Sequence, residues 1–377
     1  MSGCTYTHDS LSPRRRVQLA LDHQTTDRVP ITLLCGEPDQ PSREGLARHL
    51  GVDAGEGVDR YLEQYVDLIA IGPSFRAADP DYRGPALERT PKGGYQDVWG
   101  CHWDPISYGA ASHSEISHYP LAAVQEIADL EKHRWPSPDW WDYPAIGERI
   151  AAVTAQREYA LVIHSGNPFE RTWWMRGYEQ TFLDMIDRPE LFHEIMARVT
   201  DFHLKTTRRT LAAAAGRVDL AFTADDLAGQ TGLLISLPMW EKHIKPYHVR
   251  LNRAIHEFGV KVIYHSDGAV MEAIPGLMEA GIDVLQALQF SAHGMDAAVM
   301  KERYGDRLCF EGGVSVQTTL PFGSVADVQR EVRHLIRTLG RNGGYILGPS
   351  HAIEAPTPPE NIVAMFGEAA GYRPSKG

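Results

Sequence analysis

The 377-residue sequence lacks features that mark several classes of protein. It has no apolar run near the roughly 20 residues that a membrane-spanning helix needs. The N-terminal stretch has no continuous apolar segment and no cleavage-like pattern behind it. The net charge of -12 disfavours a nucleic-acid surface, and the short basic run Arg14–Arg16 is expected on a solvated helix face. We therefore predict a soluble, cytoplasmic protein that binds neither nucleic acid nor membrane.

Cysteine is also scarce, with four residues and no CxxC pair. This usage fits a reducing compartment and disfavours a four-cysteine zinc site. Most of the four are expected to be free buried thiols. They are Cys4, Cys35, Cys101 and Cys309.

Short runs rich in Val, Ile and Leu recur along the chain, and amphipathic stretches separate most of them. This alternation predicts parallel βαβ units. Eight such runs predict an α/β fold of the (β/α)8 TIM-barrel type. A doubly wound open sheet is the alternative, because periodicity does not separate closed from open parallel sheets. The runs begin at Arg28, Asp67, Tyr159, Asp219, Val260, Ile282, Leu308 and Gly344.

The segment from about 77 to 138 breaks this alternation. It is rich in Gly, Pro, Tyr and Trp, as in "PKGGYQDVWGCHWDPISYGA". We expect an insertion that lies over the barrel mouth, within a single domain spanning residues 1–377.

Polar residues follow the predicted strands. In a barrel, chemistry gathers at the carboxyl ends of the strands, so these side chains are expected to share one rim. Each alone is also explained by a helix cap or a satisfied buried group. They are Glu37, His164, Asp225, Asp226, His265, Asp267, Gln286, Gln289, Glu311 and His351.

The stretch "VKVIYHSDGAV" places His265 and Asp267 two residues apart at a strand end. Side chains at i and i+2 share one face of a strand. With His351 they would offer two imidazoles and one carboxylate, a donor set suited to divalent iron, zinc or manganese. The alternative is that Asp267 caps a helix starting near Ala269 while His265 bonds a neighbouring loop.

Asp225 and Asp226 form a second acidic pair. One of two close carboxyl groups can serve as acid or base when its pKa is raised, or the pair can hold a substrate cation. The alternative is that one of them caps the following loop.

The stretch "NPFERTWWMRGYEQTF" carries Arg171 and Arg176 around two tryptophans. The arginines could clamp a substrate carboxylate, with Trp173 and Trp174 as an apolar wall. The alternative is a helix with core tryptophans and solvated arginines.

Several segments resemble the uroporphyrinogen decarboxylase superfamily, which includes corrinoid-linked, zinc-dependent methyltransferases. "SPRRRVQLALDHQTTDRVPI" is similar to its opening helix and strand, and "LGPSHAIEAPTPPENIVAMF" to its closing strand, loop and helix. The resemblance covers nearly the whole chain, least clearly the insertion. It implies a distorted (β/α)8 barrel with a cleft at the strand carboxyl ends and, by analogy, a homodimer.

The sequence departs from both branches of the superfamily. The decarboxylases use N-terminal arginines and an aspartate after the second strand, where this chain has "IAIGPSF", although His351 matches a histidine of their closing strand. The methyltransferases carry a His-x-Cys-Gly zinc motif and a last-strand cysteine. In "HSDG", His265 matches that motif and Asp267 replaces its cysteine, while His351 falls close to the last one. The resemblance implies a metal site with harder ligands.

The leading hypothesis is a metal-dependent methyltransferase or demethylase for a small methoxy or methylamine compound, with a corrinoid on a partner protein. His265, Asp267 and His351 would bind a divalent metal, and Asp225, Asp226 or Glu311 would act as acid or base. One alternative is a decarboxylase or lyase, in which Arg171 or Arg176 grips a small carboxylate and His351 donates a proton. Another is a non-catalytic ligand-binding barrel. The expected substrate contacts are Glu37, His164, Arg171, Trp174, Arg176 and Gln289.

Overall fold

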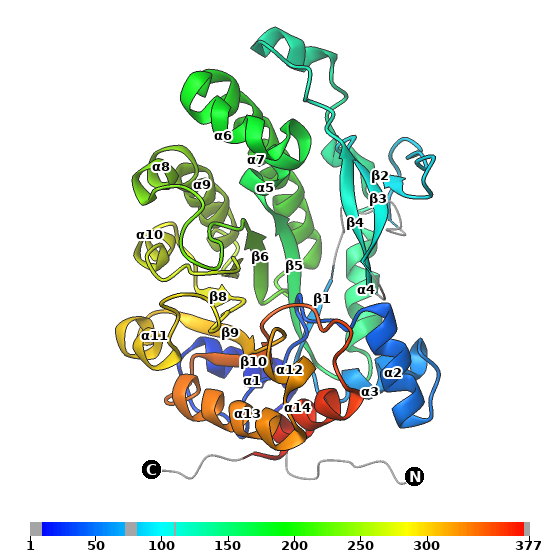
Figure 1. Ribbon diagram of the computed structural model, residues 1–377, viewed down its shortest axis with the longest axis vertical. Coiled ribbons are helices and arrows are strands. Elements are labelled where there is room, and N and C mark those ends of the chain that lie inside the picture. The colour runs from blue at the N-terminus through cyan, green and yellow to red at the C-terminus, as the bar shows by residue number, and fades with distance from the viewer. Residues whose placement is uncertain (1–9, 72–80, 109–110, 373–377) are drawn as a thin grey trace.

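A parallel sheet organises the chain. The structure is a computed structural model that describes residues 10–71, 81–108 and 111–372. In this part of the chain, seven parallel strands form one curled sheet in the order β1-β5-β6-β7-β8-β9-β10 (Figure 1). The strands are β1 (Leu68–Ala70), β5 (Ala160–Gly166), β6 (Leu220–Ala224), β7 (Lys261–His265), β8 (Val284–Gln286), β9 (Cys309–Val314) and β10 (Tyr345–Pro349).

Residues 30–32 close the sheet between β10 and β1. The Leu347 N–H donates to the Pro30 carbonyl at 2.8 Å, and the Thr32 N–H donates to the Leu347 carbonyl at 2.9 Å. On the other side, the Asp67 N–H donates to the Ile31 carbonyl at 2.7 Å. The strand predicted from Arg28 is therefore wrong: this segment forms only a bridge between Ile31 and Leu347, because Pro30 lacks the N–H that a strand needs. The distorted barrel is confirmed.

The interior of the barrel follows from alternation along the strands. Ala160 and Val162 of β5 pack inside with Ile263 of β7 and equivalent residues of the other strands, while the residues between them pack outward. Helix α1 (Pro13–Leu21) supplies Val17 and Leu21 to the same interior cluster and so seals the end where the strands begin. The mouth is the opposite end, where the strands finish.

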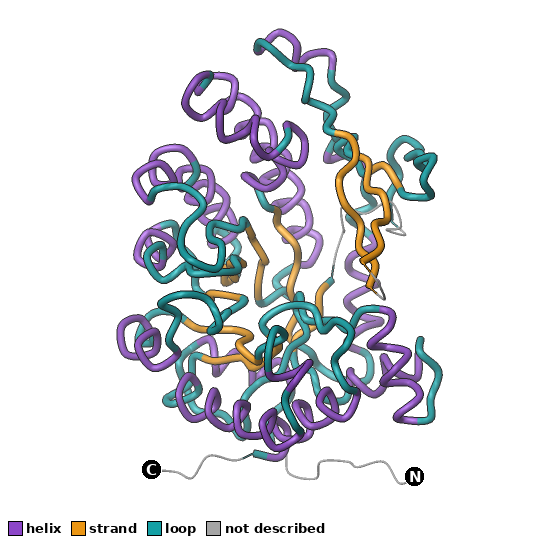
Figure 2. The backbone as a smooth tube through the Cα atoms, viewed as in Figure 1, coloured by secondary structure: helices purple, strands orange, loops and turns teal. Residues whose placement is uncertain are grey.

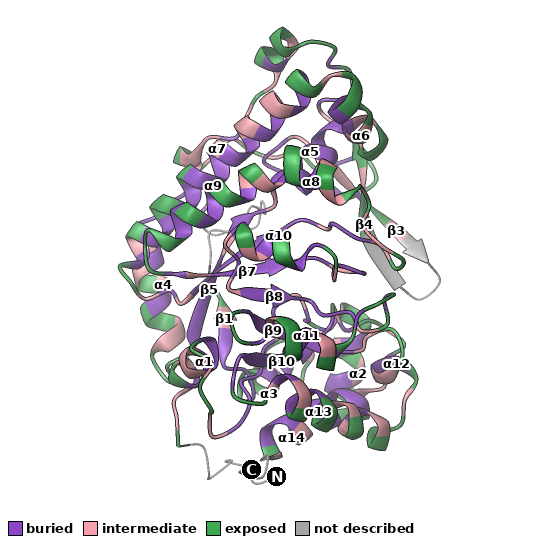
Figure 3. Cartoon of the chain, turned by 90° about the vertical axis from the view of Figure 1, so that its left-hand side faces the viewer, coloured by how far each residue is buried: buried purple, intermediate pink, exposed green. Residues whose placement is uncertain are grey.

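Helices cover the outside of the sheet (Figure 2), and the strands are buried at the centre (Figure 3). Of the helices described, none combines the length and apolarity that a membrane crossing demands. The remaining helices are α2 (Gln40–Leu50), α3 (Glu56–Glu63), α4 (Ala145–Thr154), α5 (Pro168–Arg176), α6 (Tyr178–Asp187), α7 (Pro189–Ala214), α8 (Leu237–His243), α9 (Lys245–His256), α10 (Ile274–Glu279), α11 (Ala297–Tyr304), α12 (Thr319–Phe322), α13 (Val325–Leu339), α14 (Pro359–Gly371) and the 3-10 helices η1 (Ile127–Lys132) and η2 (Pro138–Trp140).

The inserted segment forms an antiparallel sheet of its own, at one side of the barrel (Figure 1). Its strands are β2 (Tyr95–Gln96), β3 (His102–Tyr108) and β4 (Ala111–His118). It contacts α5, the helix that follows β5, through a 2.8 Å ion pair between Asp97 and Arg171 and a bond from the Cys101 thiol to the Trp174 carbonyl. Residues 77–80 and 109–110 of the expected insertion lie outside the described residues, and the single-domain boundary stays a prediction.

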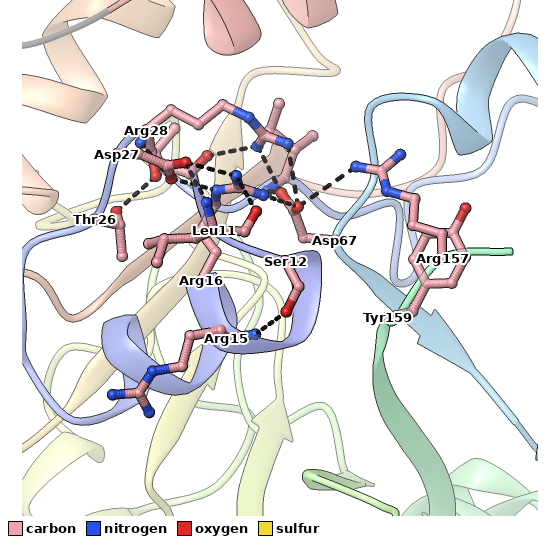
Figure 4. Close-up of polar contacts among 12 residues, drawn as sticks. Leu11, Ser12, Arg15, Arg16, Thr26, Asp27, Arg28, Asp67, Arg157 and Tyr159 are labelled. Atoms are coloured by element: carbon pink, nitrogen blue, oxygen red, sulfur yellow. Dashed lines mark hydrogen bonds and ion pairs between the residues drawn. The ribbon is translucent and has the colours of Figure 1, made fainter. Parts of the chain in front are cut away.

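A buried ion cluster lies beneath the barrel, where the strands begin (Figure 4). Asp67, which precedes β1, is fully buried and pairs at 2.6 Å with both Arg16 and Arg28. Arg16 also pairs with Asp27 at 2.6 Å, and although burial raises the pKa of Asp27, the Arg16 guanidinium lowers it to about 2. The solvated helix face expected for Arg14–Arg16 is wrong for Arg16, because a buried carboxylate requires a buried counter-charge.

Replacing Arg16 is expected to destabilise the fold. Arg16→Ala should lower the free energy of unfolding by about 3 to 5 kcal/mol, because it leaves Asp67 with one fewer cation in a buried site. Arg15→Ala, an exposed position of the same basic run, is the matched control and should change it by less than about 0.5 kcal/mol. Denaturant unfolding measures both. Equal losses would contradict the role assigned to the cluster.

Candidate metal centre at the barrel mouth

The alternation that builds the apolar interior continues into a polar layer at the mouth. Ile263 lies inside the barrel, so His265 and then Asp267 follow on the same face. Ala224 lies inside on β6, and Asp226 follows it. His265 is aligned with Ala224 of β6 on one side and with Gln286 of β8 on the other, so these three side chains lie at one level of the barrel.

Asp226, His265 and Asp267 form a compact group. One ligand atom from each lies within 4.8 Å of the others. His265 Nε2 is 3.7 Å from Asp226 Oδ1, which also accepts a 3.0 Å bond from the Asp267 N–H. The carboxylate side chains are 36% and 30% exposed, so the group is open to the mouth. Sequence reasoning expected His265 and Asp267 to meet, but it gave Asp226 a different role.

His351 lies at the edge of this group. Its Nε2 is 3.7 Å from Asp267 Oδ2, and its ring centre is 6.3 Å from that of His265. Its side chain is 48% exposed. The structure therefore brings the three expected ligands near one another, with Asp226 in the compact group and His351 beside it.

The loop after β7 depends on Gly268. Its φ of +82° favours glycine, and a Cβ there would lie 2.5 Å from the Gly229 carbonyl oxygen. The Gly268 N–H donates to Gln289 Oε1 at 3.0 Å, and the Gln289 amide also bonds Gln230 and Gln317. Gln289, expected to bind substrate, thus holds the loop that presents Asp267. No helix starts near Ala269, since α10 begins at Ile274.

Asp225 and Asp226 diverge, which corrects their treatment as one acidic site. Asp226 continues the interior face of β6, so Asp225 points outward toward the helices. The Asp225 carboxylate accepts the N–H groups of Phe169 and Glu170 at the start of α5 and lies 2.5 Å from His248 Nε2. It is fully buried, and burial raises its pKa. These contacts make Asp225 a helix-capping residue.

The two arginines expected to clamp a substrate carboxylate are both committed to protein groups. Arg171 pairs with Asp97, and its guanidinium lies 4.6 Å from the ring centre of Trp174 and 5.3 Å from that of Trp99. Arg176 is buried, pairs with Asp184 at 2.7 Å and donates to the Leu121 carbonyl. Their contacts hold α5 to the inserted segment and to α6. This arrangement corrects the expected clamp.

The other expected site residues lie at different depths. Glu37 is exposed, and its backbone carbonyl accepts a bond from the Ile353 N–H, two residues after His351. The half-buried His164 has its ring 5.0 Å from Phe222, whose ring is 5.8 Å from His265. Trp174 is half-buried beside the insertion. These three remain predictions for substrate contact.

Glu311 lies inside the barrel, beneath the mouth. It is fully buried, and neither carboxyl oxygen has a hydrogen-bond partner. Burial raises its pKa well above the ordinary value, against a smaller opposing effect of the Gln286 amide. Glu311 therefore lies beneath the surface of the mouth, and its role as a catalytic acid stays a prediction.

Sequence reasoning missed Glu170. It lies in the first turn of α5, and Asn167 Nδ2 donates to its Oε2 at 3.0 Å. Burial, followed by the charges of Asp226 and Asp225, raises its pKa well above the ordinary value. It is four residues past Gly166, the last residue of β5, in the same kind of strand-to-helix turn as the other rim residues, and this placement was the available signal.

The electrostatics of the compact group favour a bound cation. Burial raises the pKa of Asp267, the histidines 265 and 351 oppose this, and Asp226 adds to it. Burial is the main cause that raises the pKa of the nearby Cys35 thiol to about 12, and the charge of Asp267 adds to it. The 3.7 Å spacings exceed a hydrogen bond and match two ligands that each lie about 2.1 Å from a common ion. One imidazole and two carboxylates therefore fit zinc, iron or manganese.

Parallel strands closed around this polar mouth define a (β/α)8 barrel with its functional side chains at the strand carboxyl ends. A family model described as uroporphyrinogen decarboxylase (URO-D) matches residues 105–372. The chain therefore belongs to the uroporphyrinogen decarboxylase family, a family of enzymes.

Individual relatives agree with this assignment. A uroporphyrinogen decarboxylase of Carboxydothermus hydrogenoformans is 25% identical over 252 residues, which cover 63% of this chain and 66% of the relative. One from Syntrophotalea carbinolica is 25% identical over 254 residues, covering 64% and 68%. A solved methyltransferase from Methanosarcina mazei has a TM-score of 0.67 at 15% identity and covers 96% of this chain and 98% of its own. This likeness confirms the barrel.

Neutral replacement of the two adjacent aspartates should separate their roles. Asp225→Asn is expected to lower the free energy of unfolding by about 3 kcal/mol, because a buried charge-assisted network loses an acceptor. Asp226→Asn, which keeps an oxygen for the Asp267 N–H, should cost less than about 1 kcal/mol. Denaturant unfolding of the metal-free proteins gives both values. A larger loss for Asp226→Asn would contradict the assignment of Asp225 as the structural residue.

Proposed function

We propose that the protein is a metal-dependent methyltransferase that removes a methyl group from a small methoxy or methylamine compound and transfers it to a corrinoid on a partner protein. The observation that carries the proposal is the convergence of Asp226, His265 and Asp267 at the mouth of the barrel. Its support from related proteins is the overall likeness to a methyltransferase fold.

The residues at the mouth have distinct roles in this proposal. His265, Asp226 and Asp267 would hold a divalent ion, and His351 is near enough to Asp267 to join or support them. A bound ion would supply Lewis-acid polarisation of the substrate oxygen or nitrogen. Hard donors leave more positive charge on the ion than thiolates do, which suits the polarisation of such an atom.

Glu170 would supply a proton. It lies in the first turn of α5, close enough to Asp226 for the two charges to interact, and Asn167 Nδ2 donates to one of its oxygens. When a methyl group departs, the oxygen or nitrogen left behind gains negative charge or a lone pair. A carboxylic acid whose pKa is raised by burial holds its proton more readily and can protonate that atom.

The arginine contacts favour methyl transfer over decarboxylation of a carboxylate gripped by Arg171 or Arg176. Each of these guanidinium groups already has an aspartate partner. The N-terminal arginines 16 and 28 pair with Asp67 beneath the barrel, at the end opposite the mouth. The relatives named as decarboxylases keep decarboxylation as the second candidate.

Metal binding gives the first test of the proposal. Purified protein loaded with Zn²⁺, Fe²⁺ or Mn²⁺ and then dialysed should retain about one equivalent, measured by elemental analysis. Asp267→Ala and Asp226→Ala should each lose it, whereas Asp187→Ala, at an exposed position on α6, is the matched control and should retain it. Wild-type protein that retains none of the three ions would refute the metal-dependent mechanism.

Methyl transfer gives the second test. The metal-loaded protein should convert cob(I)alamin to methylcobalamin, followed by its absorption spectrum, only when a methoxy or methylamine donor is present. Glu170→Gln should slow this conversion by about 100-fold or more while leaving the metal content unchanged, because the amide cannot donate the same proton. Carbon dioxide release from a carboxylate substrate without corrinoid would instead establish the decarboxylase.

A further inference from the structure

One side chain on the neighbouring strand contacts the imidazole of the candidate metal centre from below. Gln286 ends β8 and is aligned with His265 of β7 in the parallel register. Gln286 Oε1 and His265 Nδ1 form a short hydrogen bond. Gln286 is fully buried, so water does not compete for this contact.

We propose that Gln286 is a positioning residue that holds His265 in the tautomer protonated on Nδ1. The Nε2 lone pair of His265 is then always directed toward Asp226 and Asp267. The purpose of this positioning, metal binding, rests on the proposed function. The tautomer itself is a property of the metal-free protein.

The orientation of the Gln286 amide is set by a second contact. Its Nε2 donates to the Leu34 carbonyl at 3.1 Å, and a carbonyl oxygen can only accept. The amide nitrogen must therefore face Leu34, and the amide oxygen must face His265. An oxygen without a proton requires a donor, so His265 Nδ1 carries the hydrogen.

This arrangement links closure of the barrel to the site. Leu34 belongs to the segment that follows residues 30–32, which complete the sheet between β10 and β1. The Leu34 carbonyl thus determines the orientation of the Gln286 amide, and the amide determines which nitrogen of the His265 imidazole carries the proton. Histidines that bind metals generally donate their second N–H to such a partner, and loss of the partner typically weakens metal binding 10- to 100-fold.

The neighbouring Glu311 supports the same arrangement. It lies at the interior position of β9 and is close enough to the Gln286 amide to be affected by it. Burial raises the pKa of Glu311 well above the ordinary value and so favours its neutral form. A neutral Glu311 does not attract the amide nitrogen away from Leu34 as a carboxylate would.

Tautomer measurement on the metal-free protein tests the proposal. Protein labelled with ¹⁵N-histidine would be examined at about pH 8, where an ordinary histidine is neutral, by two-bond ¹H–¹⁵N correlation. The His265 signals, assigned by their loss in His265→Gln, should show Nδ1 protonated and Nε2 unprotonated. Protonation on Nε2 in the wild-type protein would overturn the proposal without reference to any variant.

Three variants separate positioning from general stability. Gln286→Leu should give mixed or Nε2-protonated His265 and weaken Zn²⁺ binding about 10- to 100-fold, measured by chelator competition. Gln286→Glu keeps an oxygen acceptor for Nδ1 and should restore the wild-type tautomer. Gln18→Leu is the matched control. It removes a partly buried side-chain amide that donates to Asp219 at 3.0 Å beneath the barrel, and it should change neither the tautomer nor the affinity for Zn²⁺.

The outcomes also distinguish this inference from the proposed function. A wild-type protein with the Nδ1-protonated tautomer but no affinity for Zn²⁺, Fe²⁺ or Mn²⁺ would refute the metal-dependent mechanism and leave the positioning role of Gln286 intact. An unchanged tautomer in a folded Gln286→Leu protein would refute the positioning role alone. If Gln286→Leu does not fold, the wild-type spectrum and Gln286→Glu still decide it.

Discussion

The alternation of side chains along closed parallel strands is the constraint on which the rest of the structure depends. Every second residue of a strand lies inside the barrel, so the interior is a stack of layers that each strand contributes to in turn. Lower layers are apolar and are sealed by α1. The layers above them contain first His265 and Gln286 and then the aspartates 226 and 267, because those residues continue the same interior faces.

The carboxylates at the two ends of the barrel have different charged neighbours. Beneath it, the buried carboxylate of Asp67 is matched by two guanidinium groups, which satisfies the requirement that a buried charge be paired. At the mouth, the neighbours that oppose the raised pKa of Asp267 are histidines, and Asp226 acts in the same direction as burial. The lower end therefore stabilises the fold, while the upper end retains an unmet demand for positive charge.

The parallel register of the strands also determines which side-chain atoms meet at the mouth. Closure through residues 30–32 positions Leu34, the Leu34 carbonyl sets the Gln286 amide, and that amide meets His265 because β7 and β8 are aligned at those residues. The inserted segment contacts another part of the rim, at α5. Its Asp97 pairs with Arg171 of α5, the helix that carries Glu170 and is capped by Asp225.

Sequence by itself determined the barrel and the shared face of His265 and Asp267, since both follow from hydrophobic runs and from a two-residue period that needs no distant partner. The same period also separates Asp225 from Asp226, a consequence that could have been drawn from the sequence. Only the tertiary structure decided that Asp226 joins the compact group, that Arg16, Arg171 and Arg176 have protein partners, and that Gln286 faces His265. Those facts depend on which strands are neighbours and on their register, and residues such as Arg16 and Asp67 meet across a separation in sequence that no local pattern encodes.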